Sequence, residues 1–262
     1  GQGLVASTDN FGALGERPSH PELLDWLARR FIADGWSLKA MHRVVMLSST
    51  YQMAASVEHS PSSTDPENRL LSRFPLRRLE AEEIRDALHF VAGTLDLAMG
   101  GKTIPLKNRE FVFDHTSKDA TRYDSPRRAI YLPIIRNHLY DLFEQFDYPD
   151  PAVPTGSRNA TVVAPQALLM MNSDLVEQAA AKLAAQLLAQ NDLPDAERVE
   201  LAYVKAYGRP PTARELMRAQ NFLGQFERTV SAQKPDGKDG RAQAWTVLCQ
   251  TILAANEFIY LN

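Results

Sequence analysis

The sequence of 262 residues contains one cysteine, Cys249. A lone cysteine excludes an internal disulfide, and it cannot supply the cysteine pair that zinc ribbons and c-type haem attachment need. The six histidines show no metal-binding spacing either. We therefore expect no cofactor and no metal in this chain. A loop with Asp114, His115, Asp119 and Asp124 has the groups to hold a divalent ion or to act in acid–base chemistry, but a polar surface loop is the simpler interpretation.

Long apolar runs are absent as well. No stretch approaches the roughly 18 consecutive apolar residues that span a bilayer, and the N-terminus lacks the charged and apolar regions of a signal peptide. We expect no membrane insertion by this chain. The sequence starts at Gly1 without a methionine and shows its first helical pattern only after Ser19, so we interpret it as a fragment of a longer protein.

The charges are nearly balanced, with 29 Lys and Arg against 32 Asp and Glu. This balance gives no overall positive field that would attract nucleic acid, and we expect no nucleic-acid partner. Three catalytic patterns are also missing: the Gly-x-Ser-x-Gly elbow of hydrolases, the phosphate-binding loop and the His-Glu-x-x-His zinc helix. The sequence therefore favours no standard hydrolase, nucleotide-binding or zinc-protease chemistry.

Helical periodicity dominates both ends of the chain. Ser19 and Glu22 form a predicted capping box before the first helix, and Ser37 is predicted to cap the second. Near the other end, Thr212 and Glu215 form a second predicted capping box before a long helical pattern. These start signals, together with apolar residues at helical spacing behind them, indicate a chain built mainly of helices.

The middle of the chain, residues 99–160, lacks this helical period. Two short runs there, 111–113 and 129–132, favour strands. We therefore predict a mainly α fold: a single helical domain over 1–262, with a small β or irregular insertion in the middle third. Its predicted parts are a helical part at about 19–98, a polar irregular part at about 99–160 and a helical part at about 161–262.

Arginine and carboxylate side chains are concentrated around the third predicted helix and in the polar middle. In one interpretation they form ion pairs that hold loops lacking regular hydrogen bonds, since each guanidinium offers five donors. In another they line a polar cleft that grips a hydroxylated or anionic ligand. A partner-protein interface is the third possibility. The aromatic residues that would give such a cleft a flat apolar surface are Tyr123, Tyr131, Tyr140 and Phe146.

Several strings along the chain form a recognisable set. They are Phe11-Gly12-x-Leu14-Gly15, Ser19-His20-Pro21-Glu22-Leu23-Leu24, Ser48-Ser49-Thr50-Tyr51, Asp65-Pro66-Glu67-Asn68-Arg69, Arg77-Arg78-Leu79-Glu80, Phe146-Asp147-Tyr148-Pro149-Asp150, Pro165-Gln166-Ala167-Leu168 and Asn256-Glu257-Phe258-Ile259-Tyr260. As a set they resemble the planctomycete-specific C-terminal domain of unknown function, found in large exported proteins beside cytochrome c modules. The resemblance covers essentially the whole chain, although no single string identifies a reaction.

The resemblance implies a context more than a reaction. Proteins of this kind usually carry an export signal, a companion domain and often a c-type haem module, and many occur in bacteria rich in polysaccharide-degrading enzymes. The resemblance therefore implies an exported, periplasmic or cell-surface location, with haem only in a separate domain of the parent protein. It also implies carbohydrate or companion domains as partners. A segment that normally lies upstream is missing here, so a site shared with that segment would be incomplete.

The family pattern also singles out polar positions that overlap the arginine and carboxylate set. The candidate ligand-binding residues are Arg78, Arg85, Asp86, Arg128, Arg136, Arg158, Gln166 and Asn172. Our leading hypothesis is an accessory module of an exported, cytochrome-associated protein, which binds carbohydrate or docks a redox partner. The alternative is an enzyme acting on a sugar or polysaccharide, with Glu80 or Asp147 as acid or base and the arginines as substrate clamps. An open pocket lined by Glu80, Asp147 and Arg136 would favour the enzyme, whereas pairing of these residues with each other under cover would favour a structural role.

Overall fold

The computed structural model describes residues 3–55, 65–101, 103, 123–135, 139–233 and 240–261. Helices make up 54% of these residues, and the only sheet among them has two strands, which confirms the predicted mainly α fold. The chain divides into two compact units, one with Gly1–Arg78, Pro154–Arg158 and Tyr260–Asn262, and the other with Leu79–Val153 and Asn159–Ile259. The expectation of a single domain over 1–262 stays a prediction.

The first unit contains a short 3₁₀ helix, Gly12–Leu14 (η1), and two α-helices, Pro21–Ala33 (α1) and Leu38–Met46 (α2). Ser37 caps α2 as predicted, because its hydroxyl accepts the backbone N–H of Ala40 at 3.2 Å. The predicted capping box before α1 is wrong. His20 is the residue before this helix, and the Ser19 hydroxyl contacts the imidazole Nδ1 of His20 at 2.9 Å instead of capping the helix.

The helices of the first unit keep large apolar side chains on the surface. Neither α1 nor α2 has a buried residue. Leu38 at the start of α2 and Leu47 just after its end are mostly exposed. A tight turn joins the two helices through Gly35 and Trp36, both with positive φ, and Trp36 packs edge-on against Phe31 with ring centroids 5.3 Å apart.

The sheet lies outside the middle third where we predicted strands. Arg77–Arg78 (β1) pairs antiparallel with Tyr260–Leu261 (β2), in the register Arg77 to Leu261 and Arg78 to Tyr260. Of the two predicted runs, 111–113 lies outside the described residues. The prediction of a strand at 129–132 is wrong, because Ala129–Tyr131 forms a 3₁₀ helix (η2).

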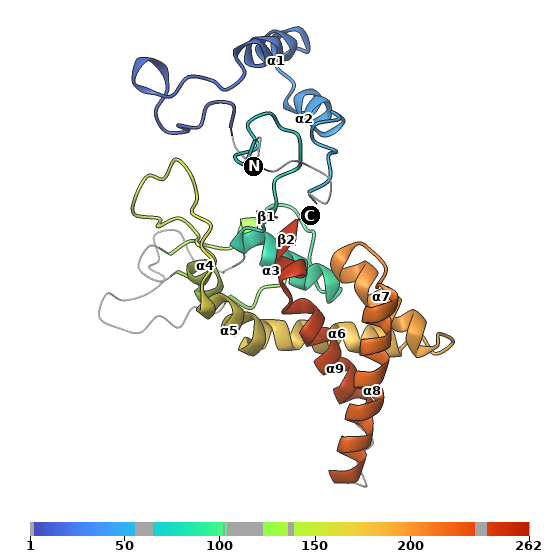
Figure 1. Cartoon of the computed structure of the whole chain (residues 1–262). Helices are drawn as coiled ribbons and strands as arrows, with labels where there is room; N and C mark the ends of the chain where they lie inside the picture. Colours follow the sequence, from blue (N-terminus) through green and yellow to red (C-terminus); the bar gives the residue numbers. More distant parts are fainter. Residues whose placement is uncertain are drawn as a thin grey trace, which may run out of the picture. The chain divides into compact units, whose positions relative to one another are not determined.

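The second unit holds the remaining helices. They are Ala81–Val91 (α3), Asp141–Gln145 (α4), Ala164–Asn172 (α5), Asp174–Leu188 (α6), Asp195–Tyr207 (α7), Ala213–Gln233 (α8), Gly240–Leu253 (α9) and Asn256–Ile259 (α10). The closest packing joins α6 to α9, and α8 also packs on α9 (Figure 1). Along the described residues, none of the helices is both long and apolar enough to cross a membrane.

The core of the second unit lies between α6 and α9. Leu183 and Leu187 of α6 and Trp245 of α9 are completely buried. Small residues let the two helices approach closely, since Ala180 is also fully buried on α6. Cys249 lies in the same core, and burial raises the pKa of its thiol to about 12. The thiol therefore stays protonated and acts as a small apolar side chain.

Candidate functional site

The larger of the two clefts described in the second unit has a volume of about 660 Å³. We call it the Tyr140 cleft, and its lining residues are Tyr140, Asp141, Leu142, Gln145, Pro165, Leu168, Leu169, Asn172, Ser173, Asp174 and Leu175. The lining combines one aromatic ring with leucines, carboxylates and amides. This mixture suits a ligand that has both apolar faces and hydroxyl groups.

Three helix termini bring these side chains together. Tyr140 precedes the first residue of α4, and Asn172 is the last residue of α5. Ser173 then caps α6, with its hydroxyl accepting the Val176 N–H at 3.4 Å. The cleft is therefore built where α4 begins and where α5 gives way to α6. Short capping residues such as Ser and Asn are favoured at these positions, which leaves polar groups beside the cleft.

The Tyr140 ring is held from two sides. It stacks on Tyr123, with centroids 4.7 Å apart and an interplanar angle of 23°, and meets Phe143 edge-on at 5.3 Å. Phe143 is fully buried. The hydroxyl of Tyr140 hydrogen-bonds the guanidinium of Arg85, and burial raises the pKa of this phenol. Tyr140 is thus a fixed, neutral aromatic wall, as expected of the flat surfaces in a binding cleft.

Arg85 and Asp86, two predicted ligand-binding residues, form hydrogen bonds with main-chain groups of the second unit. Arg85 is 0% exposed and donates to the carbonyl oxygens of Ser125 and of Arg127, the latter at 2.8 Å. The Asp86 carboxylate accepts the Ala129 N–H at 2.7 Å and lies 3.6 Å from the Arg85 guanidinium. These contacts bind the carbonyls of Ser125 and Arg127 and the N–H of Ala129, and the segment also pairs with Asp96 through a parallel β-bridge to Arg127.

Three of the other arginine candidates belong to the described residues. Arg128 is exposed beside Asp86; burial raises the pKa of this carboxyl, and the charge of Arg128 offsets part of that rise. Arg78 is 8% exposed in β1, and Arg158 is exposed in the segment Pro154–Arg158 of the first unit. Arg136 lies outside the described residues. None of these three arginines belongs to the described lining of the Tyr140 cleft, whereas Arg85 hydrogen-bonds the Tyr140 hydroxyl of that lining.

Asp147 and Gln166 fasten the chain ahead of α5. The carboxylate of Asp147 accepts both the N–H and the hydroxyl of Thr161, each at 2.9 Å. Asp147 has a positive φ of 59°, a backbone conformation that Asp tolerates better than most residues. The Gln166 amide is buried and donates to the Gln145 carbonyl at 2.9 Å and to the Thr161 hydroxyl at 3.4 Å. Together these groups fix the loop between α4 and α5.

Glu80 has a helix-capping position. It precedes α3 and forms a capping box, in which its N–H donates to the Glu83 carboxylate at 2.8 Å. Neither Glu80 nor Asp147 belongs to the described lining of the Tyr140 cleft. Among the candidate catalytic and ligand-binding residues that the structure describes, Asn172 alone lines it, together with Tyr140 from the candidate aromatic residues. The Asn172 amide also donates to the Leu168 carbonyl at 2.8 Å.

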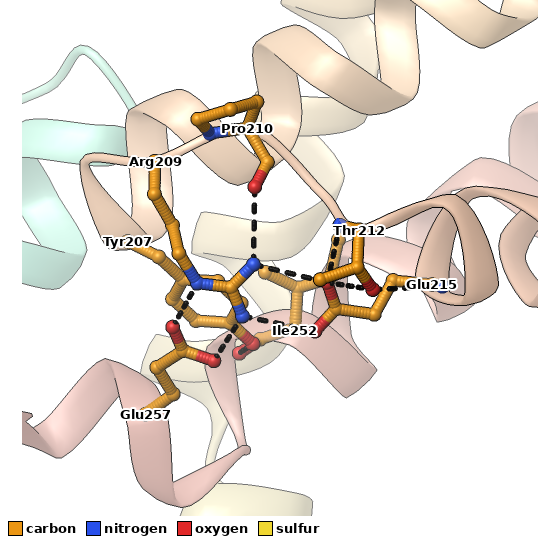
Figure 2. Close-up of polar contacts among 7 residues, drawn as sticks. All are labelled: Tyr207, Arg209, Pro210, Thr212, Glu215, Ile252 and Glu257. Atoms are coloured by element: carbon orange, nitrogen blue, oxygen red, sulfur yellow. Dashed lines mark hydrogen bonds and ion pairs between the residues drawn. The ribbon is translucent and has the colours of Figure 1, made fainter. Parts of the chain in front are cut away.

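Sequence reasoning missed a cluster around Arg209, shown in Figure 2. The guanidinium binds both oxygens of Glu257 at 2.6 and 2.7 Å and both oxygens of Glu215 at 2.9 Å. Arg209 follows Gly208, which ends α7 in the left-handed conformation with φ of 72°. The cluster therefore ties the turn after α7 to the start of α8 and to α10 (Figure 2).

One signal for this cluster was present in the sequence. The predicted capping box of Thr212 and Glu215 is confirmed, since the Thr212 N–H donates to Glu215 at 2.7 Å and the Glu215 N–H to the Thr212 hydroxyl at 3.3 Å. The hydrogen bonds from Arg209 lower the pKa of Glu215 to about 2, with help from Thr212. Nearby, the Tyr207 hydroxyl donates to the Ile252 carbonyl at 2.8 Å.

The described residues include no group of three or more His, Cys, Asp or Glu side chains placed to hold a metal ion. Of the loop considered above, only Asp124 is described, while Asp114, His115 and Asp119 lie outside the described residues. The expectation that this chain holds no metal and no haem stays a prediction. The Tyr140 cleft and the Arg209 cluster are two polar arrangements among the described residues.

The chain was compared with known proteins in three ways. Neither the curated proteins nor the solved structures gave a significant match. The family model PSD1, described as a protein of unknown function (DUF1553), matches residues 1–223. This match includes every residue of the Tyr140 cleft and ends within α8. Since it covers most of the chain, the protein belongs to the PSD1 family of unknown function.

Proposed function

We propose that this chain is a non-catalytic binding module that holds a saccharide in the Tyr140 cleft. The observation that carries the proposal is the lining of this 660 Å³ cleft, where the ring of Tyr140 lies with the amides of Gln145 and Asn172 and the carboxylates of Asp141 and Asp174. A sugar ring has apolar C–H faces and an edge of hydroxyl groups. It therefore matches a flat aromatic wall flanked by short polar side chains.

The polar groups of the cleft are suited to hydroxyl groups in particular. A carboxylate accepts hydrogen bonds at two oxygens, and an amide both donates and accepts. Asp141, Asn172 and Asp174 are exposed, so a ligand reaches them without a change in the fold. The position of Tyr140 is fixed by Tyr123 and Arg85, which lowers the entropy cost of forming a binding site.

A binding role fits these contacts better than catalysis. Glu80 caps α3, and Asp147 holds Thr161. A general acid or base has to lie within reach of the bond that it attacks or protonates, whereas these two carboxylates hold backbone groups away from the described lining of the cleft.

The wider setting of the proposal rests on the family resemblance of the sequence. We place the chain as an accessory module of an exported, cytochrome-associated protein linked to the use of complex carbohydrates. Haem would then belong to a separate domain of the parent protein, and companion domains would be its protein partners. The location would be periplasmic or at the cell surface.

A glycan array tests the proposal on the purified chain, followed by calorimetric titration of the glycan that gives the strongest signal. Asn172→Ala removes an amide from the cleft, whereas Asn221→Ala removes an exposed helical amide outside it. We expect Asn172→Ala to weaken binding about tenfold, roughly the loss of one good hydrogen bond. Asn221→Ala should bind as tightly as the unmodified chain.

Two outcomes would contradict the proposal. One is the absence of any glycan signal from a chain that shows a cooperative thermal transition. The other is equal binding by the unmodified chain and by Asn172→Ala together with Asp174→Ala, because these residues line the cleft on both sides of the junction between α5 and α6.

A further inference from the structure

A second cleft of about 390 Å³ lies among α7, α8, α9 and α10 of the second unit. We call it the Tyr203 cleft, and its lining residues are Tyr203, Tyr207, Glu215, Arg218, Ala219, Phe222, Leu248, Thr251, Ile252, Ala255 and Glu257. It adjoins the Arg209 cluster of Figure 2, because Tyr207, Glu215, Ile252 and Glu257 belong to both.

The floor of the Tyr203 cleft is apolar. Ala219 is 4% exposed, Leu248 is 7% exposed and Ile252 is 3% exposed. Phe222 forms a half-buried wall and packs against Phe226, with ring centroids 5.6 Å apart. An apolar group of a small ligand would be buried on this floor, and each Å² of apolar surface removed from water would favour binding by about 25 cal/mol.

One side of the cleft carries excess negative charge. Glu215 and Glu257 both line the cleft, and both bind the single guanidinium of Arg209. Two carboxylates sharing one cation leave one net negative charge. Burial of the phenol and the charge of Glu215 raise the pKa of Tyr203, which agrees with a negative field at this end of the cleft.

The other charge of the cleft belongs to Arg218. It follows Glu215 by three positions on α8, which places both residues on one face of the helix. Arg218 is exposed, and within the described part of the chain it forms no hydrogen bond or ion pair. The cleft therefore offers negative carboxylates, a cation that forms no hydrogen bond or ion pair with any described residue, and an apolar floor between helices.

We propose that the Tyr203 cleft binds a free α-amino acid with an apolar side chain. The ammonium group binds the carboxylates of Glu215 and Glu257, the carboxylate binds Arg218, and the side chain lies against Phe222 and the apolar floor. This inference is independent of the saccharide proposal, since the two clefts share no lining residue.

The size and charge of the cleft argue against other ligand classes. Its volume lies near the lower end of the range of roughly 300–1,000 Å³ for small-molecule pockets, which suits a single amino acid better than an oligosaccharide. An organic acid alone would face the negative charge of Glu215 and Glu257, and an amine alone would face Arg218. Only a zwitterion pairs with both charges.

Calorimetric titration of the purified full chain tests the inference with three probes: L-phenylalanine, its amide, and its N-acetyl derivative. The amide lacks the carboxylate that Arg218 would bind, and N-acetylphenylalanine lacks the ammonium that the glutamates would bind. We expect L-phenylalanine to bind most tightly and each derivative to bind about tenfold more weakly, which corresponds to about 1.4 kcal/mol.

Two matched variants assign the contact to Arg218. Arg218→Gln removes the charge in the cleft, and Arg214→Gln removes an exposed charge on the same helix outside the cleft. We expect Arg218→Gln to weaken the binding of L-phenylalanine about tenfold without changing the binding of its amide. Arg214→Gln should change neither affinity. The inference is overturned by the absence of binding up to about 10 mM L-phenylalanine, by equal affinity for the three probes, or by equal effects of the two variants.

Discussion

Replacing Arg209 with alanine removes the one cation that Glu215 and Glu257 share. In the folded chain the pKa of Glu215 falls from 4.5 to about 2, chiefly because of its hydrogen bonds to Arg209. One pKa unit corresponds to about 1.4 kcal/mol, so the ionised form of Glu215 is favoured by at most about 3.5 kcal/mol. The side chains are partly exposed, 36% for Arg209 and 27% for Glu215.

Solvent screening of these partly exposed groups reduces the contribution to about 1.5–2 kcal/mol. The variant also leaves Glu215 and Glu257 near each other without a cation, which adds repulsion. We therefore expect Arg209→Ala to lower the free energy of unfolding by about 2 kcal/mol near pH 7, and the melting temperature by about 4–8 °C for a chain of this size.

Urea denaturation followed by circular dichroism measures this loss across pH. The folded pKa of Glu215 lies below its unfolded value, so its stabilisation is fully present above pH 4.5 and is lost as the pH falls toward 2. The difference in free energy of unfolding between the unmodified chain and Arg209→Ala should therefore shrink as the pH falls from 4.5 toward 2. Arg209→Lys should recover only part of the stability, because lysine keeps the charge but cannot bind two carboxylates through a planar fork.

Arg228→Ala is the matched control, since Arg228 is an exposed arginine on α8 whose guanidinium donates to the Gly224 carbonyl at 2.8 Å. It should change the stability by less than about 1 kcal/mol. The reasoning fails if Arg209→Ala unfolds at the same urea concentration as the unmodified chain at neutral pH, or if a stability gap stays constant down to about pH 2.

Three further predictions concern the second unit and the metal content of the chain. Arg85→Ala should lower the free energy of unfolding, measured by urea denaturation, by about 3–5 kcal/mol. The substitution leaves the Asp86 carboxylate and the carbonyl groups at 125 and 127 without their buried partner. Burial lowers the pKa of His89 to about 4, so the neutral side chain of His89 stabilises the fold above pH 6.5 and this stabilisation is lost as the pH falls toward 4. The melting temperature should therefore fall between pH 6.5 and 4, and His89→Gln should reduce that fall. Metal analysis after dialysis should find far less than one equivalent of zinc, iron or copper, and about one equivalent would direct attention to His115 and its neighbours.

The local features of the fold were predictable from the sequence. A cap depends on a few neighbouring residues, so Ser37 and the Thr212–Glu215 box could be recognised from spacing alone. The capping box predicted at Ser19 is wrong because His20 is the residue before the helix, and the Ser19 hydroxyl contacts the imidazole Nδ1 of His20. The strand predicted at 129–132 is wrong because Ala129–Tyr131 forms a 3₁₀ helix, whose first N–H binds Asp86 of α3, 43 positions away in the sequence.

The candidate site was predictable only in part. The sequence marked Arg85, Asp147 and Gln166 as polar residues of interest, but the type of residue does not reveal whether its partner is a ligand or a carbonyl group of the same chain. All three bind their own chain in the structure. Arg209 was missed because its partner Glu257 is 48 positions away in the sequence, and nothing local to either residue indicates the pair.

A crystal structure of the chain with the oligosaccharide that binds most tightly is the most direct test of saccharide binding in the Tyr140 cleft. We expect a sugar ring stacked on Tyr140, with its hydroxyl groups hydrogen-bonded to Asn172 and to Asp141 or Asp174. A saccharide bound elsewhere on the chain, with the Tyr140 cleft holding only solvent, would show that this cleft is not the saccharide site.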